Sequence, residues 1–166
     1  IDGTVNILHA AVVNKVDRVI LACSSSTYGD SPTLPKKEDT IGNPLSPYAI
    51  TKYAIEQYAA VFKKTYGLNF VGLRYFNVFG PKQSPDNPYA AVIPIFCKAF
   101  LEGKVPTING DGETSRDFTY VDNAVQANIL SIFTEDKKAL NQVYNVACGE
   151  QTSLNEMVSI LNKISS

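Results

Sequence analysis

Ser46-Pro47-Tyr48-Ala49-Ile50-Thr51-Lys52 is the stretch from which the fold of this chain can be read. Its serine is a good helix N-cap and its proline suits a first helical position, so a helix is predicted to begin at Pro47. The spacing of the apolar residues beyond it continues that helix to Tyr66. Tyr48 and Lys52 are four residues apart, which places them on one helical face, one turn from each other.

The pair of Tyr48 and Lys52 can carry acid–base chemistry. A free tyrosine has a pKa of about 10 and is a poor base at neutral pH. A nearby ammonium and a helix N-terminus both favour the phenolate, which can take a proton from a sugar hydroxyl and later return one. The alternative, which the pair alone leaves open, is that Tyr48 packs and Lys52 is solvated.

A short apolar run ends in hydroxyl residues before this helix. Residues 18–23 (RVILAC) predict a strand buried on both faces, as parallel strands are. The run leads into Ser24-Ser25-Ser26-Thr27-Tyr28-Gly29, which puts three serine hydroxyls where open α/β sheets bind ligands. A serine-rich turn without a role is the alternative.

Helical and strand patterns alternate along the rest of the chain, which predicts an α/β fold with a mainly parallel sheet. Further helices are expected over 1–16, 89–102 and 124–133, and after Ser153, which can form a capping box with Glu156. Pro94 should kink its helix or delay its start. Asp122 should cap the helix over 124–133, whose inward residues should be Val125, Ile129, Ile132 and Phe133. Further strands are expected over 69–75, 105–108, 117–120 and 143–146.

Composition narrows the class of protein. The 166 residues are 45% apolar and 19% charged with a net charge of −1, which suits one domain with a small lobe. No basic patch predicts nucleic-acid binding, and no apolar run approaches the ~18 residues of a membrane span. Cys23, Cys97, Cys148 and the single His9 have no metal-site spacing, so no metal is expected. Unpaired cysteines without a secretory signal indicate a cytoplasmic protein.

Four segments together resemble the extended short-chain dehydrogenase/reductase family. They occur in the order SSSTYG (24–29), PLSPYAITK (44–52), RYFNVFGP (74–81) and NGDGETSRDF (109–118). The chain is most similar to the NAD-dependent nucleotide-sugar epimerase/dehydratase branch, and within it to the UDP-glucose and UDP-N-acetylglucosamine 4-epimerases. The resemblance implies epimerisation at C4 of a UDP-hexose through a transient 4-keto intermediate, with glucose, galactose and their N-acetyl forms all left open.

The resemblance also implies the domain organisation. Residues 1–88 would be the C-terminal part of an NAD(P)-binding, Rossmann-like, doubly wound parallel sheet. Residues 89–166 would be part of a small substrate-binding lobe, with 121–146 returning to the Rossmann-like core.

Catalytic and cofactor residues can be carried over one by one. Tyr48 matches the family's catalytic base, and Lys52 the lysine that supports it and hydrogen-bonds the nicotinamide ribose of NAD. The catalytic serine would be Ser24 or Ser25. Tyr75 and Phe76 match the segment beside the nicotinamide ring.

Substrate residues follow in the same way. Ser25 and Asn77 match residues that contact the UDP-sugar, and Ala91 and Val92 match a segment that lines its site. The small Ala91 would leave room for an N-acetyl group. Arg116 matches an arginine that holds the diphosphate, a role that the guanidinium fork suits. Its alternative is an ion pair with Asp117 or Glu113.

One family feature is missing from the 166 residues: they contain neither GxGxxG nor GxxGxxG, the glycine-rich turn that binds the NAD pyrophosphate. The sequence therefore resembles an internal portion, about half of a typical member. By that resemblance, the chain alone is expected to have an unpaired sheet edge, to bind NAD weakly and to be inactive.

Three further expectations depend on the family. A 4,6-dehydratase or decarboxylase of the same branch is an alternative, although dehydratases carry an acidic pair where this chain has Ser25-Ser26 or Ser26-Thr27. A catalytically inactive nucleotide-sugar-binding module is another. The complete protein would be a homodimer in which the helix over 47–66 forms part of a four-helix interface.

Overall fold

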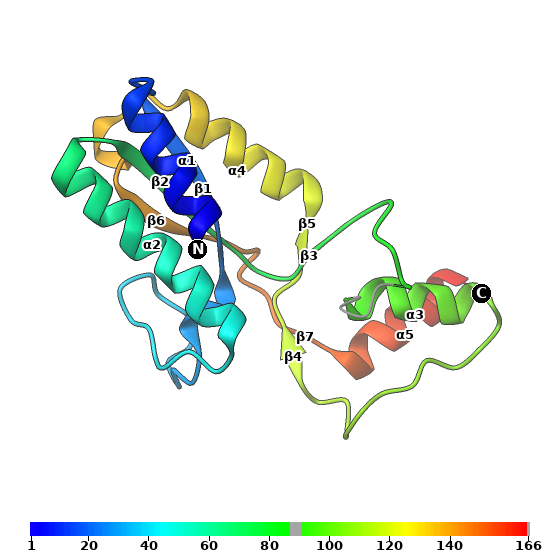
Figure 1. The fold of residues 1–166 in the computed structure, drawn as a ribbon. Helices are drawn as coiled ribbons and strands as arrows, with labels where there is room; N and C mark the ends of the chain where they lie inside the picture. Colours follow the sequence, from blue (N-terminus) through cyan, green and yellow to red (C-terminus); the bar gives the residue numbers. More distant parts are fainter. Residues whose placement is uncertain (87–90, 166) are drawn as a thin grey trace. The chain divides into compact units, whose positions relative to one another are not determined.

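Three parallel strands form the main sheet of the protein, as seen in a computed structural model that describes residues 1–86 and 91–165. The strands are β1 (Arg18–Ser24), β2 (Asn69–Tyr75) and β6 (Gln142–Val146), and their order is β1-β2-β6 (Figure 1). Arg18 pairs with Asn69 and Val71 with Gln142, so the carboxyl ends of all three strands reach the same edge of the sheet. The predicted α/β fold with a parallel sheet is confirmed.

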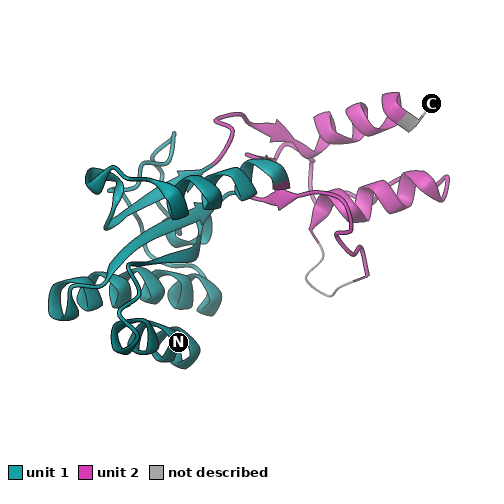
Figure 2. Cartoon of the chain, turned by 90° about the horizontal axis from the view of Figure 1, so that it is seen from above, with its two compact units in different colours: residues 1–76, 122–146 teal, residues 77–121, 147–166 magenta. Residues whose placement is uncertain are grey.

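The chain divides into two units (Figure 2). The first unit contains residues 1–76 and 122–146, and therefore holds the whole main sheet. The second contains residues 77–121 and 147–166.

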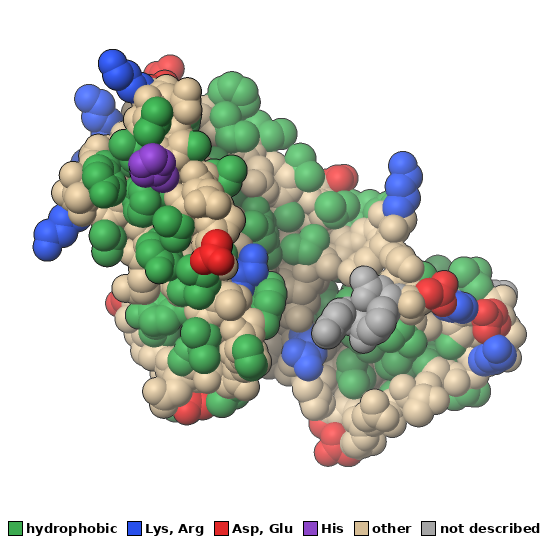
Figure 3. All heavy atoms as spheres, viewed as in Figure 1, with side chains coloured by type: hydrophobic (Ala, Val, Ile, Leu, Met, Phe, Trp, Pro, Cys, Tyr) green, Lys and Arg blue, Asp and Glu red, His purple; other side chains and the backbone are tan. Residues whose placement is uncertain are grey.

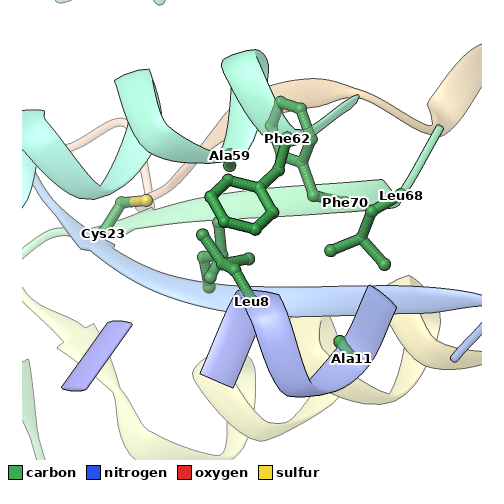
Figure 4. Packing of buried hydrophobic residues seen from close by; sticks show 8 residues of the cluster. Leu8, Ala11, Cys23, Ala59, Phe62, Leu68 and Phe70 are labelled. Atoms are coloured by element: carbon green, nitrogen blue, oxygen red, sulfur yellow. The ribbon is translucent and has the colours of Figure 1, made fainter. Parts of the chain in front are cut away.

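Helices cover both faces of the sheet in the first unit. On one face, α1 (Asp2–Val13) and α2 (Pro47–Tyr66) pack a core of Leu8, Ala59 and Phe62 against Phe70 of β2 (Figure 4). Because side chains alternate along a strand, Val71 and Leu73 point to the other face, where α4 (Val121–Phe133) contributes Ala127. The predicted helix over 47–66 and strand over 69–75 have the predicted ends.

The side of α4 that packs is not the predicted one. Val125, Ile129, Ile132 and Phe133 are exposed, whereas Ala124, Ala127 and Ser131 point inward. These small residues recur at helical spacing, so α4 lies close to the sheet on a narrow stripe and leaves its larger apolar side chains outside. The helix also begins at Val121, so Asp122 lies in its first turn and is not its cap.

The second unit is built from short elements. Strand β3 (Val78–Phe79) pairs in parallel with β5 (Thr119–Tyr120), and β4 (Ser115–Arg116) pairs antiparallel with β7 (Thr152–Ser153). Two helices, α3 (Val92–Leu101) and α5 (Leu154–Ser165), pack on each other.

Three details of this unit correct or complete the sequence prediction. Residues 105–108 form no strand: they pair with no other segment that the structure describes, Val105 is almost fully exposed and Pro106 lacks the N–H that a strand ladder needs. Pro94 lies in the first turn of α3, where its missing N–H costs no helical hydrogen bond, so the helix begins late at Val92 and is not kinked there. The predicted capping box is confirmed, since Ser153 N–H donates to Glu156 Oε2 at 2.8 Å and Glu156 N–H donates to Ser153 Oγ at 3.1 Å.

The described residues hold neither a candidate membrane helix nor a candidate metal site. No helix in residues 1–86 and 91–165 is long and apolar enough to cross a membrane. Within the same residues, no three His, Cys, Asp or Glu side chains gather so that they could hold a metal ion.

Candidate active site

The N-terminus of α2 fixes the first candidate residues. Ser46 caps the helix as predicted, with its Oγ accepting a hydrogen bond from Ala49 N–H at 3.1 Å, and Pro47 occupies the first turn. Tyr48 follows directly and is 56% exposed, so its hydroxyl is accessible to a ligand. The sequence thus builds a rigid helix start with a tyrosine in its first turn.

Lys52 lies one turn further along α2 and is held in place. Its Nζ donates to the carbonyl oxygen of Ala22 in β1 at 2.7 Å and lies 5.7 Å from the centroid of the Tyr48 ring. The predicted pair is therefore brought together, with an ammonium beside an exposed phenol.

The serine run lies at the carboxyl end of β1. Ser24 is the N-cap of the short 3₁₀ helix η1 (Ser25–Tyr28), and its Oγ accepts hydrogen bonds from Ser26 N–H at 3.2 Å and from Ser26 Oγ at 3.0 Å. With both lone pairs used as acceptors, the hydroxyl hydrogen of Ser24 is left to donate to another group. Ser25 begins the turn and is half-buried.

Tyr75 and Phe76 point in different directions. The Tyr75 hydroxyl accepts a hydrogen bond from Asn128 Nδ2 at 2.7 Å, so its side chain lies on the α4 face of the sheet, opposite α2. Burial raises the pKa of Tyr75. Phe76 instead lies against Tyr28 of the serine turn, with ring centroids 6.0 Å apart.

Cys23 is next to the serines but is not suited to nucleophilic chemistry. Burial, together with the carboxylate of Glu56, raises the pKa of its thiol to about 12. Since the thiolate is the reactive form, this cysteine is inert at neutral pH.

The second unit gathers four predicted substrate residues around one cavity of about 270 Å³. Asn77, Ala91, Val92 and Arg116 all line it, and Val78, Phe79, Ile93 and Phe118 complete the lining. The sequence did not predict the two phenylalanines as lining residues, although Phe79 lies in the family segment 74–81 and Phe118 in the family segment 109–118. Phe79 packs edge-on against Phe118, with centroids 6.4 Å apart, which fixes part of the cavity wall.

Asp117, which follows Arg116 in the chain, anchors this part of the cavity wall. Asn77 has a left-handed backbone with φ of 34°, and its Nδ2 donates to the Asp117 carbonyl oxygen at 2.7 Å. The Asp117 carboxylate accepts the N–H groups of Cys148 at 3.0 Å and Gly149 at 2.7 Å. The segment that carries Arg116 is therefore anchored on two sides.

Arg116 forms no ion pair among the residues that the structure describes. The alternative partners are committed elsewhere: Asp117 binds backbone N–H groups, and Glu113 Oε1 accepts Asn155 Nδ2 at 2.7 Å. The exposed guanidinium fork on the cavity wall matches the geometry of phosphate oxygens.

The first unit offers polar groups suited to a ribose. Tyr48 and Lys52 present a hydroxyl and an ammonium at the carboxyl end of a parallel strand, where ribose hydroxyls can be bound. The 166 residues contain no glycine-rich turn for a pyrophosphate.

Comparison with known proteins decides the family. The model of the NAD dependent epimerase/dehydratase family matches residues 1–147. The chain belongs to this family. The resemblance stated from the sequence and its Rossmann-like fold class are confirmed, and the family is NAD-dependent by its description.

Several family members are similar over nearly the whole chain. The structure of UDP-N-acetylglucosamine 4-epimerase from Methanobrevibacter ruminantium, in complex with UDP-N-acetylmuramic acid, is 44% identical, with a TM-score of 0.93, and covers 99% of this chain and 52% of its own. That of UDP-glucuronic acid 4-epimerase from Bacillus cereus, with UDP-glucuronic acid and NAD, is 37% identical, with a TM-score of 0.88, and covers 98% and 50%.

A decarboxylase is also among the relatives. The UDP-N-acetyl-alpha-D-glucosaminuronate decarboxylase of Bacillus cytotoxicus is 35% identical over 98% of this chain and 50% of its own length. The chain spans about half the length of the curated relatives it matches.

Proposed function

We propose that this chain serves in the NAD-dependent epimerisation of a UDP-hexose at C4. The observation that carries the proposal is the Tyr48–Lys52 pair, with the ammonium 5.7 Å from the tyrosine ring and the ring exposed. Such a pair can remove the proton of a secondary hydroxyl while hydride leaves the same carbon, and can return the proton to the oxygen when hydride comes back to either face of the carbon. When bound, NAD would supply the hydride acceptor and donor for C4.

Each residue has a defined part in the proposed reaction. Tyr48 takes the proton of the C4 hydroxyl and later returns it to the 4-keto oxygen. Ser24 donates a hydrogen bond to the same oxygen, which its use as a double acceptor toward Ser26 supports over Ser25. Lys52 would hold its ammonium beside the Tyr48 ring and bind the nicotinamide ribose.

The cavity of the second unit would hold the nucleotide side of the substrate. Arg116 would bind the diphosphate, and Asn77 would contact the diphosphate or the sugar. If the substrate is held by its nucleotide, the 4-keto sugar can rotate and present its opposite face between the two hydride transfers. The small Ala91 on the cavity wall supports an N-acetylated hexose as one substrate.

The decisive assay uses the natural protein that carries this chain. It should interconvert UDP-glucose with UDP-galactose, or their N-acetyl forms, without net consumption of NAD. Tyr48→Phe should lower kcat about 10²–10⁴-fold, because it removes the general base and little else. Turnover of Tyr48→Phe at the unmodified rate would contradict the role of the tyrosine.

The same assay separates the alternatives. A decarboxylase, the activity named for one relative, would release CO₂ from a UDP-uronic acid. The serine turn carries no acidic residue between Ser24 and Tyr28, which disfavours a dehydratase. Binding of UDP-sugars without any turnover by the natural protein would leave the binding module as the function.

A homodimer is proposed for the complete protein. Ile50, Val61 and Tyr66 of α2 and Ile7 and Val13 of α1 are exposed apolar side chains, and Figure 3 shows hydrophobic side chains gathered on this side of the first unit. Covering them would remove apolar surface from water. Sedimentation of the natural protein at twice the monomer mass is the expected result.

A further inference from the structure

A buried ion pair joins α2 to β2. Arg74 Nε donates to Glu56 Oε1 at 2.9 Å, and Arg74 Nη2 donates to Glu56 Oε2 at 2.8 Å. Each side chain is 4% exposed. Two parallel hydrogen bonds fix both the distance and the relative orientation of the groups, which a single contact would not do.

The remaining sides of the Arg74 guanidinium are also engaged. Its Nη1 donates to the carbonyl oxygen of Glu38 at 3.0 Å, and its carbon lies 4.9 Å from the centroid of the Tyr28 ring. The Tyr28 hydroxyl in turn donates to Asn145 Oδ1 at 2.6 Å. Arg74 therefore connects α2, β2, the loop before α2 and the turn that contains the serines.

The connected elements are those that carry the candidate catalytic residues. Glu56 lies four residues after Lys52 and eight after Tyr48, so the three form one stripe along α2. Arg74 stands two residues before Phe76. Through Tyr28, the pair also reaches the turn that begins after Ser24.

Stability alone does not account for this arrangement. Taking two charges out of water costs free energy, and well-packed apolar residues often replace a buried ion pair at no loss of stability. Apolar contacts, however, do not fix one position of a helix along the strand on which it packs. Burial lowers the pKa of Arg74, but the two hydrogen bonds that it donates to the Glu56 carboxylate outweigh burial and raise the pKa overall, so the guanidinium stays charged.

We propose that Glu56 and Arg74 are positioning residues. Their bidentate pair fixes the position of α2 along β2, so that Tyr48 and Lys52 reach the sugar hydroxyl in a reactive geometry. The inference rests on the proposed function, since it concerns the residues of that reaction. It assigns to two residues outside the ligand sites an effect on kcat.

The test compares loss of the pair with its replacement, in the natural protein. Glu56→Gln leaves Arg74 with an uncompensated charge and should lower both the melting temperature and kcat. The double variant Glu56→Leu/Arg74→Met removes both charges, so its melting temperature should recover. Its kcat should stay about 10–100-fold below that of the unmodified protein, the size of effect expected from a misplacement of about 1 Å. KM for the UDP-sugar should change little, because the residues proposed to hold the nucleotide belong to the other unit.

The control is an exposed ion pair. Glu102 and Lys104 pair at 2.6 Å on the surface of the second unit, with side chains 41% and 70% exposed. Glu102→Gln should leave kcat and the melting temperature unchanged. Recovery of kcat together with stability in the double variant would mean that the pair is only structural, and would overturn the inference.

A crystal structure of the double variant gives an answer that does not depend on turnover. Displacement of α2 along β2, with loss of the hydrogen bond from Lys52 to Ala22, would support the inference even if the natural protein epimerised no sugar. An unchanged α2 would overturn it. Absence of turnover in the unmodified protein would overturn the proposed function alone.

Discussion

Ala91 is the residue at which the choice of sugar can be tested. It lines the cavity together with Asn77 and Arg116, and its side chain is a single methyl group. Ala91→Asn fills part of that space and adds two polar groups. We expect kcat/KM to fall about 10-fold or more for UDP-N-acetylglucosamine and much less for UDP-glucose, because one lost pocket contact changes discrimination by about that amount.

The comparison for this prediction is Ala10→Asn, on the exposed side of α1 and outside the cavity. It should leave the preference between the two sugars unchanged. Equal losses for both sugars in Ala91→Asn would mean that the residue faces the nucleotide and not the N-acetyl group.

Single residues differ in how far a sequence reveals them. Tyr48 and Lys52 could be predicted because a helical spacing of four fixes their proximity. Glu56 and Arg74 could not be paired in advance, since they lie 18 residues apart on different elements. Arg74 stands within the apolar run of β2, where a buried guanidinium needs a partner, but no local pattern names the residue that supplies it. The roles of the predicted site residues stay predictions.

At the scale of one element, α1 offers a test of the core. Leu8 is completely buried among Ala59, Phe62 and Phe70, whereas the adjacent Ile7 is 63% exposed. Leu8→Ala should lower the free energy of unfolding by ~2–5 kcal/mol, and Ile7→Ala by less than ~0.5 kcal/mol. Urea unfolding followed by circular dichroism measures both. Both values refer to a dilute, monomeric sample of the 166-residue chain, because the proposed homodimer would cover Ile7. Similar losses in the monomer would contradict the exposure of Ile7.

The capping box of α5 makes a prediction about pH. Hydrogen bonds from the backbone and side chain of Ser153 lower the pKa of the Glu156 carboxyl. Its contribution to the helix start is therefore complete above the ordinary value of about 4.3 and is lost as pH falls through the lower, folded value. The amide proton of Ser153 should report this loss by NMR, with a midpoint below about 4.3.

Glu156→Gln is the matched variant for this titration. It keeps the shape of the side chain but removes the ionisable group, so the Ser153 amide should no longer titrate. A midpoint at or above that of a free glutamate in the unmodified chain would contradict the carboxylate–amide hydrogen bond.

The ends of a helix could be predicted where several local signals agreed. The buried face of a helix was predicted wrongly where packing against the sheet determined it. The helix Pro47–Tyr66 has a cap, a first-turn proline and a glycine stop, and its predicted ends are correct. The face of α4 was predicted from hydrophobicity alone, but a stripe of alanine and serine packs there. How closely a helix approaches a sheet depends on the side chains of both. The periodicity of the helix sequence alone does not contain that information.

The whole molecule consists of two units between which the chain passes three times, after residues 76, 121 and 146. Four residues are predicted to bind NAD, and all of them belong to the first unit: Tyr48, Lys52, Tyr75 and Phe76. Of the residues predicted to meet the UDP-sugar, Asn77, Ala91, Val92 and Arg116 belong to the second unit and Ser25 to the first. These roles were accessible from the sequence only through the family resemblance, because no local pattern tells which ligand a unit binds. That the first unit binds NAD and the second the nucleotide part of the substrate stays a prediction.

That assignment has a crossed test in the natural protein. Lys52→Met keeps the length of the side chain but loses the ammonium, and should weaken NAD binding about 10-fold or more while leaving UDP binding unchanged. Arg116→Gln should do the reverse, since it removes a charged donor from the cavity of the second unit. Calorimetry with each ligand measures both constants. In the double variant each affinity should equal that of the relevant single variant, because sites without shared partners act independently. Loss of NAD affinity in Arg116→Gln, as large as that in Lys52→Met, would mean that the two ligands do not divide between the units.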